Sequence, residues 1–227
     1  MESYPIIRLR HLKMNEQIDL LESGKERNEM KRKYGRIGIL IMALMLTLSS
    51  QAFAAQFPDI QSGTPLENAA AVVSALDVMQ PFEDGTFRPE QAMTRAEFMK
   101  VVVLVNGLGE VAALENSSKY SDVPAGSEDA GYIMVASNLG LVEGYEDGTF
   151  RPEEEILYEQ AVKIVIRMLN YDQHLDEKTA YPFGYLALAE QLRISKNVNG
   201  TVGKAVTRGQ VALLVYNSLN VPIMTII

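Results

Sequence analysis

Two short stretches of the chain combine residue types that suit the binding of an anion. Residues 94–97 read Thr-Arg-Ala-Glu and residues 207–210 read Thr-Arg-Gly-Gln, and each stretch precedes apolar residues at helical spacing. Threonine with Glu or Gln three residues on is a capping box, which explains those two positions. It does not explain the arginine, because the helix dipole opposes a cation in the first turn. Since a guanidinium pairs with a carboxylate through two parallel bonds, we predict ligand contacts at Arg95 and Arg208, for which the alternative is a solvated surface position. We include Thr94, next to Arg95, among the predicted ligand-binding residues.

The two stretches belong to a repeated unit. Residues 83–90 read Glu-Asp-Gly-Thr-Phe-Arg-Pro-Glu, and residues 146–153 repeat this octapeptide without change. The same offset carries residues 57–60 onto residues 120–123. A third, degenerate copy is indicated by residues 185–189, which are similar to residues 132–136, and by the second Thr-Arg stretch. Separate blocks that keep one spacing indicate duplication of a whole structural unit.

Each unit has the pattern of a short helix, a loop and a longer helix. The Asp-Gly pairs at 84–85 and 147–148, each followed by a proline, predict a tight loop between the helices. We therefore predict an all-α fold of three tandem helix-loop-helix repeats. The apolar faces are expected at Ala69, Val72, Val73 and Leu76, at Ile133, Ala136 and Leu139, at Phe98, Val101, Val102 and Val105, at Ala161, Ile164, Val165 and Met168, and at Val211, Leu214, Val215 and Leu219.

Three motifs in order give the chain a family resemblance over roughly residues 56–220. The F-x-D opening at 57–59, the Gly144 to Pro152 loop and the Thr-Arg-Ala-Glu helix start together resemble S-layer homology domains. The resemblance implies three repeats packed about a pseudo-threefold axis with the longer helices inside, since one helix pair cannot bury its own apolar face. It also implies noncovalent binding of a secondary cell-wall polysaccharide, often bearing pyruvate ketals, in grooves between repeats. The arginine matching Arg95 is among the residues that line such grooves.

Other residues enter the predicted site through this resemblance. Asp59 and Asp122 are candidates to accept sugar hydroxyls, and the alternative is a turn or cap bond to the local backbone. Tyr158 stands where the second copy would have its arginine and is also a candidate ligand residue. The preceding Leu157 cannot cap, so that helix start should be weaker by about 1 kcal/mol. The third copy lacks the Asp-Gly-Thr-Phe-Arg-Pro loop, and the tryptophan common in family repeats is absent.

Composition argues against several classes of function. The chain has no cysteine and only two histidines, which makes disulfides, thiolate or histidine metal sites and a serine-histidine triad hard to build. We expect no cofactor, no metal and no catalytic residue. From residue 55 on, twelve Lys and Arg face twenty-three Asp and Glu. This acidic body lacks the basic footprint of a nucleic-acid-binding protein.

The first 54 residues are typical of an export signal. Residues 30–36 are basic, residues 37–48 are apolar, and Ala52-Phe53-Ala54 fits a cleavage site, so we predict a secretory signal peptide cut after Ala54. A retained anchor is the alternative, although the apolar run is short for a membrane span and none is expected after cleavage. Residues 1–29 either precede the start codon in use or form a cytoplasmic leader. The predicted domains are 1–54, leader and signal; 55–119, repeat one; 120–180, repeat two; and 181–227, degenerate repeat three with an apolar tail that has no obvious packing partner.

The sequence thus predicts a secreted, non-enzymatic protein of the bacterial cell wall or surface, which holds an exported protein to a cell-wall polysaccharide. Further domains beyond residue 227 would be the cargo. One alternative is an S-layer-homology-like structural or protein-interaction module without glycan binding, and another is part of a cell-wall-processing enzyme. If Arg95 serves the ligand, Arg95→Ala should weaken binding and barely change the melting temperature.

Overall fold

The computed structural model describes residues 57–175 and 181–224, all within one compact unit that begins at Gln56. The predicted signal peptide lies outside the described residues. Across the two described ranges the chain forms helices and no β-strand, and none of these helices is long and apolar enough to cross a membrane. The elements are α3 (Pro65–Ala75), α4 (Arg95–Val105), α5 (Gly109–Leu114), α6 (Glu128–Asn138), α7 (Tyr158–Met168), the short 3-10 helix η1 (Tyr171–His174), α9 (Phe183–Gln191) and α10 (Arg208–Ser218).

The all-α prediction is confirmed, but the predicted difference in helix length is found only in the third unit, where α9 has 9 residues and α10 has 11. Helices α3, α4, α6 and α7 each have 11 residues, so in the first two units the first helix is as long as the second. Leu76 and Leu139, predicted to be core residues, are 53% and 49% exposed. Both are C-caps, and the chain turns away in the left-handed region at the next residue, Asp77 or Gly140.

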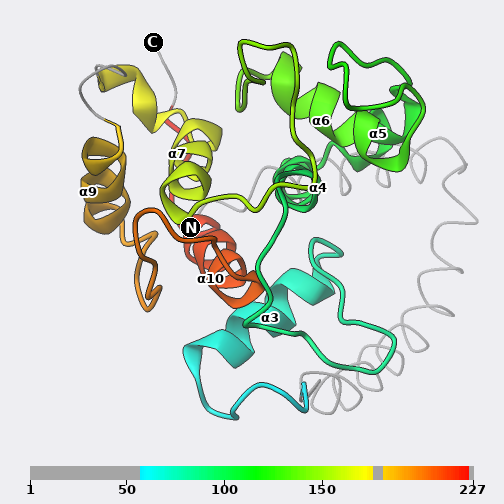
Figure 1. Cartoon of the computed structure of the whole chain (residues 1–227). Coiled ribbons are helices and arrows are strands. Elements are labelled where there is room, and N and C mark those ends of the chain that lie inside the picture. The colour runs from blue at the N-terminus through cyan, green and yellow to red at the C-terminus, as the bar shows by residue number, and fades with distance from the viewer. Residues whose placement is uncertain (1–56, 176–180, 225–227) are drawn as a thin grey trace, which may run out of the picture. The chain divides into compact units, whose positions relative to one another are not determined.

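The helices pair between units rather than within them. Helix α4 packs against α6, α7 against α9, and α10 against α3 (Figure 1). The second helix of each unit therefore lies against the first helix of the next unit. Because α10 of the third unit packs against α3 of the first, the three units close into a ring.

A cycle of three backbone hydrogen bonds lies at the centre of this ring. The N–H of Met93 donates to the carbonyl of Val206 at 3.0 Å, that of Val206 to Ile156 at 2.9 Å, and that of Ile156 to Met93 at 3.0 Å. All three side chains are buried, with at most 1% exposed. The residue two positions before each second helix thus bonds to its counterparts in the other two units, which fixes where α4, α7 and α10 begin.

The first N–H of each second helix forms a second cycle of bonds between units, which runs in the opposite order. Arg95 donates to the carbonyl of Glu154 at 2.8 Å, Tyr158 to Lys204 at 2.9 Å, and Arg208 to Gln91 at 2.9 Å. These N–H groups have no partner within their own helix. The loop of the following unit supplies one, so each helix start is held by its neighbour.

Two features of the fold differ from the sequence expectation. Helix α5 was not expected, and it packs on α6 so tightly that a Cβ at Gly131 would overlap the Ala112 carbonyl. The C-terminal segment was expected to lack a packing partner. As far as it is described, to residue 224, it has one: Val221 packs against the core, and the N–H of Met224 donates to the carbonyl of Leu169 at 3.0 Å.

Candidate functional site

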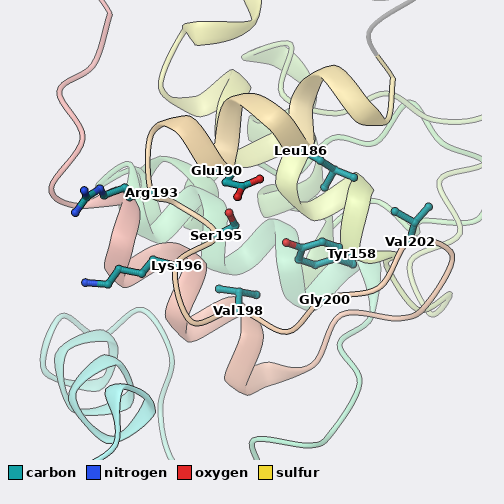
Figure 2. Close-up of a pocket in the computed structure, with 9 residues that line it drawn as sticks. All are labelled: Tyr158, Leu186, Glu190, Arg193, Ser195, Lys196, Val198, Gly200 and Val202. Carbon is teal, nitrogen blue, oxygen red and sulfur yellow. The ribbon is translucent and has the colours of Figure 1, made fainter.

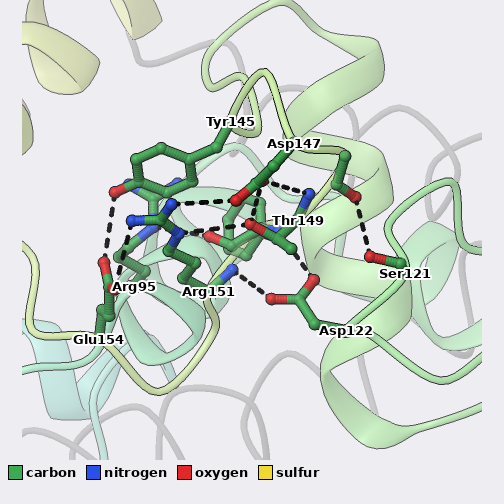
Figure 3. Close-up of polar contacts among 10 residues, drawn as sticks. Arg95, Ser121, Asp122, Tyr145, Asp147, Thr149, Arg151 and Glu154 are labelled. Atoms are coloured by element: carbon green, nitrogen blue, oxygen red, sulfur yellow. Dashed lines mark hydrogen bonds and ion pairs between the residues drawn. The ribbon is translucent and has the colours of Figure 1, made fainter.

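Arg95, the first residue of α4, reaches into the second unit and is buried there, with 5% exposed. Its Nε donates to the carbonyl of Phe150 at 2.9 Å, and Nη2 lies 3.5 Å from the carbonyl of Glu143. The guanidinium carbon is 4.6 Å from the ring centre of Phe150 and 5.1 Å from that of Tyr145 (Figure 3). Arg95 therefore holds the loop of the next unit by two carbonyl contacts and two ring faces.

Arg208, the first residue of α10, repeats this arrangement against the first unit. Its Nε donates to the carbonyl of Phe87 at 2.9 Å and Nη2 to that of Gln80 at 3.0 Å. The guanidinium carbon lies 4.8 Å from the ring centre of Phe82, and 8% of the residue is exposed. Burial lowers the pKa of Arg208 from its ordinary value.

The two arginines are thus neither solvated surface residues nor exposed groove rims. Cross-unit carbonyl bonds explain a cation at the first helical position, which capping alone left open. In the described part of the chain, Nη1 of each arginine makes no hydrogen bond and is not sealed from solvent. One edge of each guanidinium is structural, and the other can meet a ligand.

Asp59 and Asp122 hold the loops that the arginines contact. Asp122 accepts from the N–H of Phe150 at 2.8 Å and from that of Arg151 at 2.7 Å (Figure 3). Asp59 accepts from the N–H of Phe87 at 2.9 Å and from that of Arg88 at 2.6 Å. Burial raises the pKa of Asp122, but its backbone hydrogen bonds outweigh burial and the pKa is lowered. Both aspartates bond to backbone N–H groups, but not to the local backbone that the alternative named. The bonded residues lie 28 and 29 positions away rather than nearby in sequence.

Each loop is further fixed by its own side chains. Asp147 accepts from the hydroxyl and the N–H of Thr149, and forms an ion pair with Arg151 at 3.1 Å. The Thr149 hydroxyl bond is the largest cause that lowers the pKa of Asp147 to about 2. Arg151 has its guanidinium carbon 3.8 Å from the ring centre of Tyr145. Two guanidinium groups, those of Arg95 and Arg151, therefore meet one ring (Figure 3).

Tyr158 takes the arginine position in the second unit, and its partner has changed with it. Counting back eight residues from Arg95, Tyr158 and Arg208 gives Phe87, Phe150 and Gly200. The phenylalanines are buried in the first two loops, whereas a Cβ at Gly200 would overlap the ring of Tyr158. The tyrosine ring thus covers the third loop where a phenylalanine is missing, and Tyr158 is 6% exposed.

The helix caps follow the sequence prediction. The Thr94 hydroxyl accepts from the N–H of Glu97 at 3.2 Å, and the Glu97 carboxylate accepts from the N–H of Thr94 at 2.8 Å. Leu157 has no acceptor, so only the return bond forms there, from its N–H to Oε1 of Gln160 at 3.1 Å. Thr94 therefore serves its own helix.

Two elements of the site were missed from the sequence. One is the aromatic residue at the loop entrance, Phe82 or Tyr145, on which the guanidinium groups stack. Its signal was its constant place two residues before the Asp-Gly pair. The other is Glu159, a buried carboxylate that accepts from the N–H of Gly203 at 3.0 Å. Within the described ranges, no three His, Asp or Glu side chains cluster in a way that could hold a metal.

Comparison with known proteins finds a family match over part of the chain. Residues 56–99 and 119–162 match the model of the S-layer homology domain, and residues 181–227 lie outside both matched segments. Among similar proteins, the "Middle cell wall protein" of Brevibacillus brevis is 30% identical over 191 residues, which are 82% of this chain and 18% of that protein. The "Cell surface protein" of Thermoanaerobacter kivui is 32% identical over 186 residues, 80% of this chain and 24% of that protein.

A third relative gives the same picture. The "Surface layer protein" of Brevibacillus choshinensis is 28% identical over 179 residues, 78% of this chain and 16% of that protein. The chain thus spans at most about a quarter of the length of these relatives. The two family matches fall on the two units that keep the Asp-Gly-Thr-Phe-Arg-Pro loop. Residues 56–99 and 119–162 of this chain are therefore similar to the S-layer homology domain.

Proposed function

We propose that this chain holds an exported protein noncovalently to the bacterial cell wall by binding a wall polysaccharide. One observation carries the proposal: most of the chain aligns with a small part of proteins named for the cell wall, the cell surface or the surface layer. A segment shared by larger surface proteins is a module, and attachment is the role that proteins with different remaining parts would share. The third helix pair would be a degenerate copy of the same domain.

The arginines at the unit boundaries are the proposed ligand contacts. An acidic body does not attract an anionic polymer through its overall field, which salt screens beyond about 8 Å, so recognition must be local. The guanidinium groups of Arg95 and Arg151 contact the same Tyr145 ring, and the side chain of Arg151 is 39% exposed. Arg208 and Arg88 flank Phe82 in the same way. Each pair offers two cations to one carboxylate, such as that of a pyruvate ketal on the polymer.

Sedimentation with purified cell walls tests the proposal. The full chain should pellet with intact walls and stay in solution once the polysaccharide has been extracted. Arg88→Ala and Arg151→Ala should weaken pelleting without unfolding, because these side chains are 47% and 39% exposed. Lys119→Ala removes an exposed cation outside the guanidinium pairs and is the matched control. Equal pelleting on extracted walls would refute polysaccharide binding.

A second candidate is a structural or protein-interaction module without glycan binding. It is favoured by the buried carbonyl bonds of Arg95 and Arg208, which a purely structural arginine would also make. Under this reading the Arg88 and Arg151 variants would pellet as well as the unaltered chain. Release of soluble sugar from walls by the isolated chain would instead indicate an enzyme.

A further inference from the structure

A pocket of about 580 Å³ lies beside Tyr158, at the boundary where the arginine is missing. It is lined by Tyr158 at the start of α7, by Leu186 and Glu190 on α9, and by side chains from the segment that follows α9, namely Arg193, Ser195, Lys196, Val198, Gly200 and Val202 (Figure 2). The volume falls in the range of small-molecule sites. Neither Arg95 nor Arg208 lines this pocket, so its chemistry differs from that of the two guanidinium boundaries.

The Tyr158 hydroxyl is a polar group without a protein partner. The residue is 6% exposed, and its hydroxyl makes no hydrogen bond to any residue of the described ranges. In Figure 2 the hydroxyl points into the pocket, toward Glu190 and Ser195. Within the described ranges this hydroxyl is not sealed from solvent, so a ligand in the pocket can reach it. Burial, with a smaller contribution from Glu190, raises the pKa of Tyr158, which keeps the hydroxyl protonated as a donor.

The rest of the pocket completes a set of groups that suits hydroxyls. The Glu190 carboxylate is an acceptor, and the Ser195 hydroxyl can donate or accept. Apolar side chains stand around them, including Leu186 and Val198. Arg193 and Lys196 also line the pocket, but in Figure 2 their charged ends are directed away from Tyr158 and Glu190. The charge that faces the interior is therefore negative.

We propose that this pocket binds an uncharged, hydroxyl-rich saccharide unit through Tyr158, Glu190 and Ser195. The inference rests on the proposed function, since it assigns a second kind of sugar contact to the same polymer. A carboxylated sugar would meet the charge of Glu190, whereas a neutral one gives that carboxylate hydroxyl donors. The acidic units of the polymer would then go to the arginine boundaries and a neutral unit to this pocket.

Methyl NMR titration of the full chain tests the pocket. The probes are cellobiose and diacetylchitobiose as neutral disaccharides, and cellobiouronic acid as the charged counterpart of cellobiose. Neutral probes should shift the methyl signals of Leu186, Val198 and Val202, and the acid should bind at least several-fold more weakly. Tyr158→Phe keeps the ring over Gly200 and removes one hydrogen bond, so affinity should fall by about two- to tenfold.

Two further variants make the result decisive. Glu190→Gln should lower the affinity for the neutral disaccharides and reduce the difference in affinity between cellobiose and cellobiouronic acid. Tyr132→Phe, on α6, should change neither the affinity nor this difference. Tighter binding of the acid, or neutral binding unaffected by Tyr158→Phe and Glu190→Gln, would overturn the proposal. Absence of any shift at the three methyl groups would overturn it too. Wall sedimentation that persists in such a case would show that only the pocket assignment had failed, and not the anchoring function.

Discussion

The pairing of Tyr158 with Gly200 predicts how the chain responds to a single methyl group. Gly200 does not lie in the left-handed region, so its backbone accepts alanine. The added Cβ would nevertheless overlap the buried ring of Tyr158, and ring and loop would have to move apart. Overpacking of this kind costs about 1–3 kcal/mol. We therefore expect Gly200→Ala to lower the free energy of unfolding by that amount.

The same substitution should have the opposite sign once the ring is removed. In a Tyr158→Leu background the overlapping ring atoms are gone, and Gly200→Ala then acts mainly by restricting the unfolded chain. That effect is neutral to stabilising by up to about 1 kcal/mol. Urea unfolding of the four proteins, followed by far-ultraviolet circular dichroism with the slope held in common, measures the coupling. An equal loss in both backgrounds would refute the proposed contact between ring and glycine.

Three more outcomes are expected. Arg95→Ala should cost about 1–3 kcal/mol of stability, against the sequence expectation, because it leaves the buried Phe150 carbonyl without its donor. Arg151→Ala on the same ring should leave the urea midpoint nearly unchanged, because its ion pairs are solvent-exposed. Leu157→Thr supplies the missing cap of α7 and should raise the unfolding free energy by about 1 kcal/mol; an unchanged urea midpoint would contradict this. Asp84 and Asp147 have pKa values lowered from 3.8 to about 2, so the stability they provide is present above pH 4 and is lost as pH falls toward 2. Replacing both by Asn should flatten the decline of the urea midpoint between pH 4 and pH 2, and an undiminished decline would assign it to other groups.

The features that the sequence predicted are those set by neighbours along the chain. The Thr94 capping box and the missing cap at Leu157 need only four consecutive residues, and both are found in the structure. The all-α class followed from the helical spacing of apolar residues, and most of the positions predicted for the apolar helix faces are buried. The prediction that Leu76 and Leu139 are buried was wrong, because the apolar periodicity continues in the sequence after the helix has ended.

The features that the sequence did not predict depend on contacts between distant units. The partner of Arg95 is the carbonyl of Phe150, and carbonyls are the same in every residue, so no side-chain pattern indicates such a bond. The pairing of each second helix with the first helix of the next unit likewise depends on distant contacts, including the backbone hydrogen bonds among Met93, Ile156 and Val206. The Tyr158 and Gly200 pair was visible only as two separate departures from the repeat.

The hydrogen-bond cycle through Met93, Ile156 and Val206 fixes the number of units that this architecture tolerates. In a linear array, repeats can be added or removed at an end, and parts can melt independently. Here Met93 and Val206 are joined although 112 residues separate them, so excising any one unit would break two of the three bonds at once. Such a molecule is expected to unfold in a single cooperative step. In evolution it is expected to be duplicated as a complete set of three units rather than lengthened by one unit at a time.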